Sequence, residues 1–278
     1  MKISLITACY NSAATIRTAI ESVFSQKGVD VEYIVVDGGS KDGTVEVVEE
    51  FSRKERKDCK EGFELKWISE RDRGMYDAIN KGIKMATGDV VGVLNADDVL
   101  ASDDTLAHIA ELFSRKERKE DSRVERVDCV YADIRFVREG ETVEAVRKAE
   151  TVRYCSAKRW RPWMFRFAAM VPHPSFYVRR ECFERLGGYS LDYRICADFE
   201  LELRYLYLAK IKAAYLPECV VVMRMGGAST AGWRSNVEIN REDLRALRAH
   251  GVRSCMPLIY LKYPFKIWGF VFKPKEAK

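Results

Sequence analysis

The segment from Val90 to Val99, which reads VVGVLNADDV, constrains the fold of this chain more than any other. Its apolar first half is typical of a strand buried on both faces, as in a parallel sheet covered by helices. The run ends at Asp97 and Asp98, and open α/β sheets bind their ligands at the carboxyl ends of strands. Two adjacent carboxylates need hydrogen-bond donors, a shared proton or a cation. The alternative is a solvated turn in which one aspartate caps the next helix.

Three similar units precede this segment. Apolar runs at 2–8, 31–36 and 63–69 predict strands, and each is followed by apolar residues at helical spacing. The first helix is expected to begin at Asn11 or Ser12, which are both good N-cap residues. Strands that alternate with helices indicate a doubly wound, mostly parallel sheet. A chain of 278 residues is long enough to bury one substantial core.

The second half of the sequence departs from this alternation. Residues 128–134 predict a further strand, and a Glu-Gly pair within residues 135–146 predicts the turn of a hairpin. Residues 159–167, RWRPWMFRF, combine arginines with aromatic side chains, which suit sugars, phosphates or nucleobases. The alternative for this stretch is an aromatic segment that faces the core and extends its arginines to solvent.

Two polar residues of the second half are candidates for a site. Asp198 lies near the start of a predicted helix, where backbone amides stabilise a carboxylate that can accept a proton, although a capping role alone fits equally well. Glu200 and Glu202 on the same helix are expected to point to solvent. His173 lies between two prolines on a stiff loop, which makes it the best placed of the three histidines, with a structural hydrogen bond as the alternative.

Composition adds little about partners. The net charge of +5 is weak support for an anionic partner such as a nucleotide, a nucleic acid or a membrane surface. The eight cysteines form no CxxC pair, and no signal peptide is apparent, so a reducing cytosol is expected.

The C-terminal part predicts a loop followed by helices. Residues 226–234 read as a flexible loop bearing Trp233 and Arg234, which could fold over a bound substrate or be a plain linker. Residues 256–272 are strongly apolar but are interrupted by Lys262, Pro264 and another lysine. This run is short for a membrane span and suits an interfacial segment, with packing against the rest of the protein as the alternative.

Taken in order, the segments VVDGGSKDGT, GDVVGVLNADD and ADFELELR resemble the family 2 glycosyltransferases, which have a GT-A fold. The resemblance covers roughly residues 1–230. It implies a mostly parallel sheet with a Rossmann-like nucleotide-sugar half at 1–100 and an acceptor half at 101–230, followed by a C-terminal helical tail at 231–278. It further implies that a nucleotide-sugar lies across the strand ends, with a divalent metal, Mn²⁺ or Mg²⁺, on its diphosphate.

The resemblance also assigns roles to particular residues. The metal element corresponds to Asn95-Ala96-Asp97, with Asp97 as the ligand and Asp98 beside it, and Asp198 corresponds to the catalytic base. The sequence departs from the family pattern in having Asn95, Gly38 and Ala197 where acidic residues are usual, and Asn95 lowers the charge at the metal element. The remaining donor and substrate positions are Thr7, Ala8, Tyr10, Asn11, Asp37, Asp72, Arg73, Asn80, Asn95, Ala96, His173, Trp233 and Arg234.

The expected function is transfer of a sugar from a nucleotide-diphosphate sugar, with a UDP-sugar favoured, to a hydroxyl of a saccharide or polyprenyl-linked saccharide. A single displacement, assisted by a metal, would invert the anomeric centre. A nucleotidyltransferase that makes sugar nucleotides is the alternative, but residues 5–12 lack its glycine-rich loop. A nucleic-acid-binding module is supported only by the basic charge, and no nucleic-acid partner is expected. The expected location is cytoplasmic, with peripheral contact at the inner face of the plasma membrane.

Overall fold

The structure is a computed structural model, and it describes residues 1–58, 61–115, 117–118, 124–226 and 233–264. Its main sheet has the strand order β3-β2-β1-β4-β10-β8-β11-β5, and β9 pairs with β8 beside this path. The strands of this sheet are β1 (Lys2–Cys9), β2 (Asp30–Asp37), β3 (Phe63–Ser69), β4 (Val90–Val93), β5 (Val99–Leu100), β8 (Cys129–Val137), β9 (Arg153–Cys155), β10 (Tyr177–Arg179) and β11 (Ala213–Arg224). Two short strands, β6 (Glu117–Arg118) and β7 (Val124–Glu125), form a separate pair.

The first four strands of the main sheet are parallel, as predicted, because each is joined to the next by a helix. Strand β10 is antiparallel to both β4 and β8, and this reversal joins the first half of the chain to the second. The helices are α1 (Ile16–Phe24), α2 (Thr44–Asp58), α3 (Met75–Met85), α4 (Thr105–Ser114), α5 (Val143–Lys148), α6 (Arg180–Leu186), α7 (Ala197–Glu202), α8 (Trp233–Ala249) and α9 (Met256–Tyr260), with 3₁₀ turns η1 (Pro162–Phe167) and η2 (His173–Ser175) and a π-helix η3 (Leu203–Leu208).

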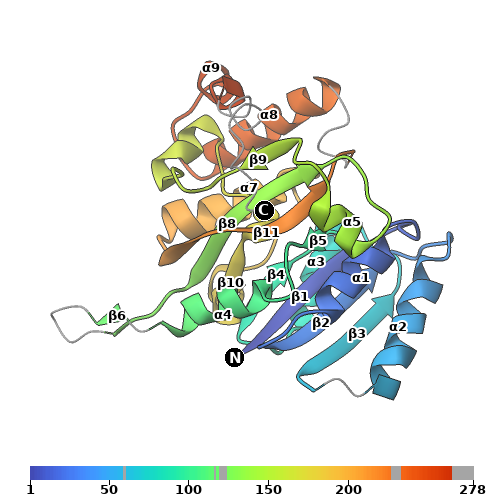
Figure 1. Cartoon of the computed structure of the whole chain (residues 1–278). Helices are drawn as coiled ribbons and strands as arrows, with labels where there is room; N and C mark the ends of the chain where they lie inside the picture. Colours follow the sequence, from blue (N-terminus) through green and yellow to red (C-terminus); the bar gives the residue numbers. More distant parts are fainter. Residues whose placement is uncertain (59–60, 116, 119–123, 227–232, 265–278) are drawn as a thin grey trace.

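Hydrophobic clusters cover both faces of the sheet because side chains alternate along each strand. In β1, Ile3 and Leu5 belong to one cluster and Ile6 belongs to the other. The helices α8 and α9 lie at the opposite end of the molecule from β3 and α2 (Figure 1). The carboxyl ends of β1 and β4 therefore open toward the space between the two halves of the chain.

The hairpin predicted for residues 135–146 is wrong. The strand runs on to Val137, and the chain then enters α5, whose N-cap Thr142 accepts a hydrogen bond from the backbone N–H of Ala145 at 3.1 Å. A Cβ at Gly140 would lie 2.6 Å from a methyl group of Val146, so the glycine lets the turn pack onto this helix. The strand that returns against β8 is β9, which lies further along the chain.

The first helix also begins later than predicted, at Ile16. Asn11 adopts a positive φ of 50°, and its side-chain oxygen accepts from the backbone N–H of Lys41 at 3.1 Å. The backbone N–H of Ser12 donates to the hydroxyl of Thr44 at 2.8 Å. Both residues therefore join the loop after β1 to the loop after β2, and neither caps the helix.

The described part of the C-terminal tail packs against the rest of the protein. Leu244 and Leu247 of α8 and Ile259 of α9 are buried in the same cluster as Phe199 of α7. Lys262, which was expected at a membrane interface, is buried and pairs with Asp243 at 2.6 Å. Residues 265–278, the rest of the apolar run, lie outside the described residues. Within the described part, no helix is both long enough and apolar enough to cross a membrane.

Candidate active site

A cavity of about 2270 Å³ opens at the carboxyl ends of β1 and β4. It brings together many of the residues that the sequence predicts for the site. Those that line it are Ala8, Tyr10, Asn11, Asp72, Asn95, Ala96, Asp97, His173 and Asp198. Four others, Thr7, Asp37, Asn80 and Asp98, contact neighbouring residues behind its wall, and Arg73 is exposed beside it. Trp233 and Arg234 begin α8, but their side chains, like the loop 227–232, lie outside the described residues.

The two aspartates after β4 differ in exposure. Asp97 is half-buried and lines the cavity, whereas Asp98 is fully buried. Burial raises the pKa of the Asp97 carboxyl, and it raises the pKa of Asp98 well above its ordinary value. The Asp98 Oδ1 atom has no hydrogen-bond partner among the described residues. The positive charge around Asp97 and Asp98 is therefore too small to balance two ionised carboxylates.

The contacts of Asn95 explain why this position has an asparagine in place of the acidic residue that is usual in the family. Its side-chain Nδ2 donates to Asp98 Oδ2 at 2.7 Å. A carboxylate at position 95 would face the buried carboxylate of Asp98 and repel it, whereas the amide supplies a donor. The asparagine therefore stabilises the turn that presents Asp97.

The residues in this corner fit a divalent cation. Asp97 offers hard carboxylate oxygens to the cavity, and its raised pKa indicates a site that would gain from a positive charge. No group of three or more His, Cys, Asp or Glu side chains in the described part of the chain could enclose a metal. One carboxylate is nevertheless enough where diphosphate oxygens and water complete the coordination, as is usual for Mg²⁺.

Arg224, at the end of β11, is a site residue that the sequence analysis missed. Its Nη1 donates to the backbone carbonyl of Asp97 at 2.5 Å, and its Nη2 donates to Thr18 Oγ1 and to the carbonyl of Gly140, both at 2.9 Å. It also lines the cavity. An arginine at the end of the apolar run VVVMR was the available signal. It places a fixed cation next to the carboxylates of Asp97 and Asp98.

Tyr10 and Asp72 form a second corner of the cavity. Tyr10 is 64% exposed, and a Cβ at Gly38 would lie 2.6 Å from Asp72 Oδ2 and 3.4 Å from the Tyr10 ring. The Asp72 carboxylate thus occupies the space that a side chain at position 38 would fill, which explains the glycine there. Asp72 Oδ1 accepts from the backbone N–H of Gly74 at 2.8 Å. Within the described residues, Asp72 Oδ2 alone is left to accept from a ligand.

Asp37 and Thr7 stabilise the loops behind this corner. The Asp37 carboxylate accepts from the backbone N–H groups of Gly39 and Ser40, both at 3.0 Å, and from the Ser69 hydroxyl at 2.6 Å. These hydrogen bonds hold the pKa of Asp37 below its ordinary value, although its burial opposes them. Thr7 is buried and donates to the carbonyl of Leu94 at 2.8 Å. Both side chains are engaged within the protein, and neither residue lines the cavity.

Asp198 lines the cavity from the first turn of α7. Its Oδ1 lies 3.1 Å from the hydroxyl of Tyr76, which also donates to the carbonyl of Ile195 at 2.5 Å. Because a tyrosine has one hydroxyl proton, Tyr76 contacts both groups but donates fully to only one. Its burial raises its pKa, so it remains neutral beside the carboxylate.

His173 belongs to the same cluster. Its Nε2 lies 2.7 Å from the hydroxyl of Tyr189, whose ring stacks on Tyr76 with centroids 5.6 Å apart. Burial lowers the pKa of His173, which favours a neutral imidazole. Asn80 holds this arrangement, since its side chain donates to the carbonyl of Tyr189 at 2.8 Å and accepts from its N–H at 2.9 Å.

The N-terminus of α7 is capped by a residue from another helix. The carboxylate of Glu242, on α8, accepts from the backbone N–H groups of Arg194, Ile195 and Cys196 at 3.0, 2.9 and 2.9 Å. No side chain at the N-cap position of α7 does so. The C-terminal helix therefore fixes the turn that ends two residues before Asp198, and the sequence analysis did not foresee it.

The solvent positions predicted for Glu200 and Glu202 are wrong, because both are buried. Glu200 pairs with Arg204 at 2.9 Å and with His250 Nε2 at 2.7 Å. Glu202 accepts from the backbone N–H of Val171 at 3.1 Å, and its burial raises its pKa well above the ordinary value. Glu200 is covered by His250, which follows α8, and Glu202 by Val171, in the loop before His173.

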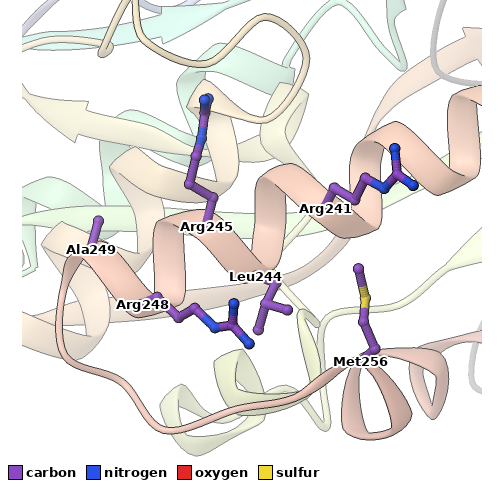
Figure 2. A pocket seen from close by; sticks show the side chains of 6 residues that line it. All are labelled: Arg241, Leu244, Arg245, Arg248, Ala249 and Met256. Carbon is purple, nitrogen blue, oxygen red and sulfur yellow. The ribbon is translucent and has the colours of Figure 1, made fainter.

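A second cavity, of about 590 Å³, lies on the outer side of α8. It is lined by Arg241, Leu244, Arg245, Arg248, Ala249 and Met256. Figure 2 shows Leu244 and Arg248 on the side of α8 toward Met256, with Arg245 pointing away from it. Arg245 lies over the ring of Tyr193 and donates to the carbonyl of Asp192, whereas Arg241 and Arg248 are exposed and have no ion-pair partner among the described residues.

The fold and the cavity define a glycosyltransferase with a GT-A fold, in which carboxylates gather at the strand ends of a curled, mostly parallel sheet. The sequence profile described as "Glycosyl transferase family 2" matches residues 4–186. The chain therefore belongs to glycosyltransferase family 2.

Named relatives are also glycosyltransferases. A "PGL/p-HBAD biosynthesis glycosyltransferase" of Mycobacterium bovis is 28% identical over 244 residues, which are 88% of this chain and 83% of the relative. A glycosyltransferase of Mycobacterium tuberculosis, described as uncharacterized, is 30% identical over 209 residues, 73% of this chain and 68% of the relative.

Solved structures share the fold at low identity. Staphylococcus aureus TarS 1-349, in complex with UDP-GlcNAc, superposes with a TM-score of 0.61 at 17% identity over 89% of this chain, and the chain spans 66% of that protein. The mannosyltransferase PcManGT from Pyrobaculum calidifontis, in complex with GDP-Man and Mn²⁺, gives a TM-score of 0.57 at 19% identity, covering 98% of this chain and 81% of that one.

Proposed function

We propose that this glycosyltransferase transfers a sugar from a UDP-sugar to a hydroxyl of a saccharide or polyprenyl-linked saccharide, with inversion at the anomeric carbon. The observation that carries the proposal is the arrangement of three carboxylates around one cavity. Asp72 lies at one corner, Asp97 lies after β4, and Asp198 lies on α7. They correspond, in that order, to a site for the nucleobase, a site for the diphosphate and the catalytic base.

The proposed nucleobase site suits uracil. An exposed tyrosine ring, Tyr10, offers a stacking surface, and Asp72 Oδ2 is the carboxylate oxygen left to accept from the base. Uracil presents a single ring N–H. Asp72 Oδ2 could accept from that N–H, and a UDP-sugar is therefore the proposed donor.

Asp97, with Asp98 behind it and Arg224 beside it, would hold a divalent metal and the diphosphate. A bound Mn²⁺ or Mg²⁺ would stabilise the charge that develops on the diphosphate as it leaves. Arg224 is fixed by contacts to the carbonyls of Asp97 and Gly140 and supplies a permanent positive charge in the same corner.

Asp198 acts as the base. It removes the proton of the acceptor hydroxyl as the acceptor oxygen bonds to the anomeric carbon, and the bond from that carbon to the diphosphate oxygen breaks with its electron pair leaving on UDP. Because the proposal includes no covalent intermediate, one displacement inverts the centre. Tyr76 orients the carboxylate through its contact at 3.1 Å.

The acceptor is expected to be reached at a membrane surface. Arg241 and Arg248 lie seven residues apart on α8, on the helix side that the second cavity occupies, and α9 next to them exposes Tyr260 and Leu261. Exposed arginines beside apolar and aromatic side chains suit the headgroup region of an anionic membrane.

A donor panel tests the proposed function. Release of UDP, GDP or dTDP from their sugars would be measured with Mn²⁺ and with EDTA, first without an acceptor. We expect release from a UDP-sugar alone, and only with the metal. Release of pyrophosphate from UTP and a sugar phosphate would instead identify a nucleotidyltransferase, and equal activity with EDTA would contradict the metal assignment.

A further inference from the structure

The large cavity has two ends of different chemistry. A site for a drug-sized ligand occupies about 300–1000 Å³. This cavity measures about 2270 Å³, so it has room for an acceptor beside a bound donor. The proposed donor end is lined by the carboxylates of Asp72 and Asp97. The other end is lined by residues 153–160 and by Trp163, which partly overlap the segment 159–167 that the sequence singles out for its arginines and aromatic rings.

The loop at this second end is held in place by a buried carboxylate. Asp133, on β8, accepts from the backbone N–H of Ala157 at 2.7 Å and from the hydroxyl groups of Tyr154 and Tyr215, both at 2.9 Å. All of these donors are themselves part of the cavity lining. Asp133 therefore fixes the loop, and its oxygens are occupied by neutral donors.

Two of the cations on this loop lack carboxylate partners among the described residues. Lys158 and Arg159 line the cavity and are exposed, and no acidic side chain among the described residues pairs with either. Asp133 does not neutralise them, because its hydrogen bonds go elsewhere. Two adjacent cations that have no partner are a favourable position for an anionic group of a ligand.

An aromatic residue follows the two cations in the same cavity lining. Trp163 is 58% exposed, and its ring forms a T-shaped pair with that of Phe167, with centroids 5.9 Å apart. Aromatic faces bind the apolar faces of flat rings, so Trp163 offers a stacking surface. The loop is also joined to the catalytic helix, since the rings of Trp160, Phe165 and Phe199 contact one another in series at 5.4 and 5.6 Å.

We propose that this second end is an acceptor subsite for a ring compound that bears an anionic group, either a phosphate or a carboxylate. The ring stacks on Trp163, the anionic group contacts Lys158 and Arg159, and a hydroxyl on the far side of the ring points to Asp198. The inference rests on the proposed function, and it deepens it by giving the acceptor a charge.

The test measures binding to the protein already saturated with UDP and Mn²⁺, so that the donor end is filled. Glucose 1-phosphate, glucuronate and glucose are titrated by calorimetry, and vesicles of phosphatidylglycerol serve as an anionic surface without a sugar. We expect at least one anionic sugar to bind about tenfold more tightly than glucose, the effect of two exposed ion pairs. Tighter binding of glucose 1-phosphate identifies the anionic group as a phosphate, and tighter binding of glucuronate identifies it as a carboxylate.

Variants assign the effect to the loop. Lys158→Gln with Arg159→Gln should reduce the affinity of the anionic sugar to that of glucose, whereas Lys84→Gln with Arg138→Gln, two exposed cations away from the cavity, should leave it unchanged. Trp163→Ala should weaken the binding of all three sugars alike. Equal affinity for charged and neutral sugars, no binding of either anionic sugar, binding of vesicles alone, or an unchanged double variant would each overturn the proposal. UDP binding in the same cell reports on the donor site separately.

Discussion

At the scale of single residues, identical chemical groups have opposite roles on one helix. Asp198, Glu200 and Glu202 lie within five residues of each other on α7, yet only Asp198 faces the cavity. Glu200 is ion-paired and has a lowered pKa, whereas burial raises the pKa of Glu202. The sequence shows three acidic residues, and only the packing around α7 distinguishes them.

The opposite pKa shifts of the two glutamates predict opposite pH effects on stability. Glu202 has a raised pKa in the folded state, so its contribution to stability is present below its unfolded pKa and is lost as the pH rises through the folded pKa. Glu202→Gln cannot ionise, and it should therefore flatten the fall in Tm with rising pH above about 4.5. Thermal unfolding between pH 5 and pH 8 measures this slope, and a slope equal to that of the unmodified protein would contradict the assignment.

Glu200→Gln should behave differently. The lowered pKa of Glu200 means that its contribution is present above the unfolded pKa and is lost as the pH falls. The substitution leaves Arg204 and His250 without their charged partner, which costs about 3 kcal/mol for a buried pair. A loss of several degrees in Tm at neutral pH is expected, and an unchanged Tm would show that the pair is not stabilising.

Asp198→Asn tests the proposal that Asp198 is the catalytic base. The asparagine keeps the shape and the hydrogen bond to Tyr76 but cannot take a proton, so kcat should fall by about 10²–10⁴ while the Kd for UDP barely changes. The Tm serves as the folding control. A parallel loss of UDP affinity and stability would mean that Asp198 only stabilises the start of α7.

At the scale of elements, the catalytic helix depends on α8 for its N-terminal cap. Glu242 accepts three backbone N–H groups before α7, and α8 also lines the cavity through Glu238, Ile239 and Asp243. A residue 46 to 48 positions further along the chain thus fixes the turn before the proposed base.

Glu242→Gln should lower kcat more than it weakens donor binding. The amide keeps one acceptor oxygen but loses the charge that three donors share, and the loss of a helix cap costs about 0.5–2 kcal/mol. We expect the kcat to fall about tenfold with an unchanged Kd for UDP, while the exposed Glu111→Gln on α4 has no effect. Equal losses in kcat and in UDP affinity would indicate general disorder of the cavity instead.

The sequence predicts some elements better than others, for identifiable physical reasons. The strand predicted at residues 63–69 has those bounds in the structure, because its alternation is local and the turns around it are clear. The hairpin at 135–146 fails because a local Glu-Gly pair competes with the helix that Thr142 caps. Local patterns identify a turn, but the packing of Gly140 on Val146 decides where the chain goes next.

The same limit applies to the site. Asp97 could be predicted because it ends an apolar strand, Asp198 because it lies near the start of a helix, and Asp72 only through the family resemblance. Glu242 could not, and the position of Arg224 after an apolar run was its only signal, because the partners of these two residues are 46 to 206 residues away in sequence. Burial of Glu200 and Glu202 likewise depends on α8 and on Val171, which no local pattern specifies.

At the scale of the whole molecule, the outer side of α8 is expected to contact an anionic membrane. Vesicles containing phosphatidylglycerol should bind the protein at low salt and release it at high salt, because the attraction between exposed charges is screened. Arg241→Gln with Arg248→Gln should weaken binding, whereas Lys84→Gln with Arg138→Gln should not. Binding that is insensitive to both salt and the arginine variant would assign the contact to another surface.

The account depends most directly on Asp97 and a metal-dependent donor site. Calorimetric titration with UDP, in the presence of Mn²⁺ and then of EDTA, measures this for the unmodified protein and for Asp97→Asn. The substitution removes the charged ligand but preserves the size of the side chain, so the fold should be retained with an unchanged Tm. We expect UDP to bind with Mn²⁺ and to lose about 100-fold in affinity either with EDTA or in the variant, as expected when a metal ligand or the metal is removed. Equal UDP affinity in all of these conditions, with the variant folded, would contradict the account.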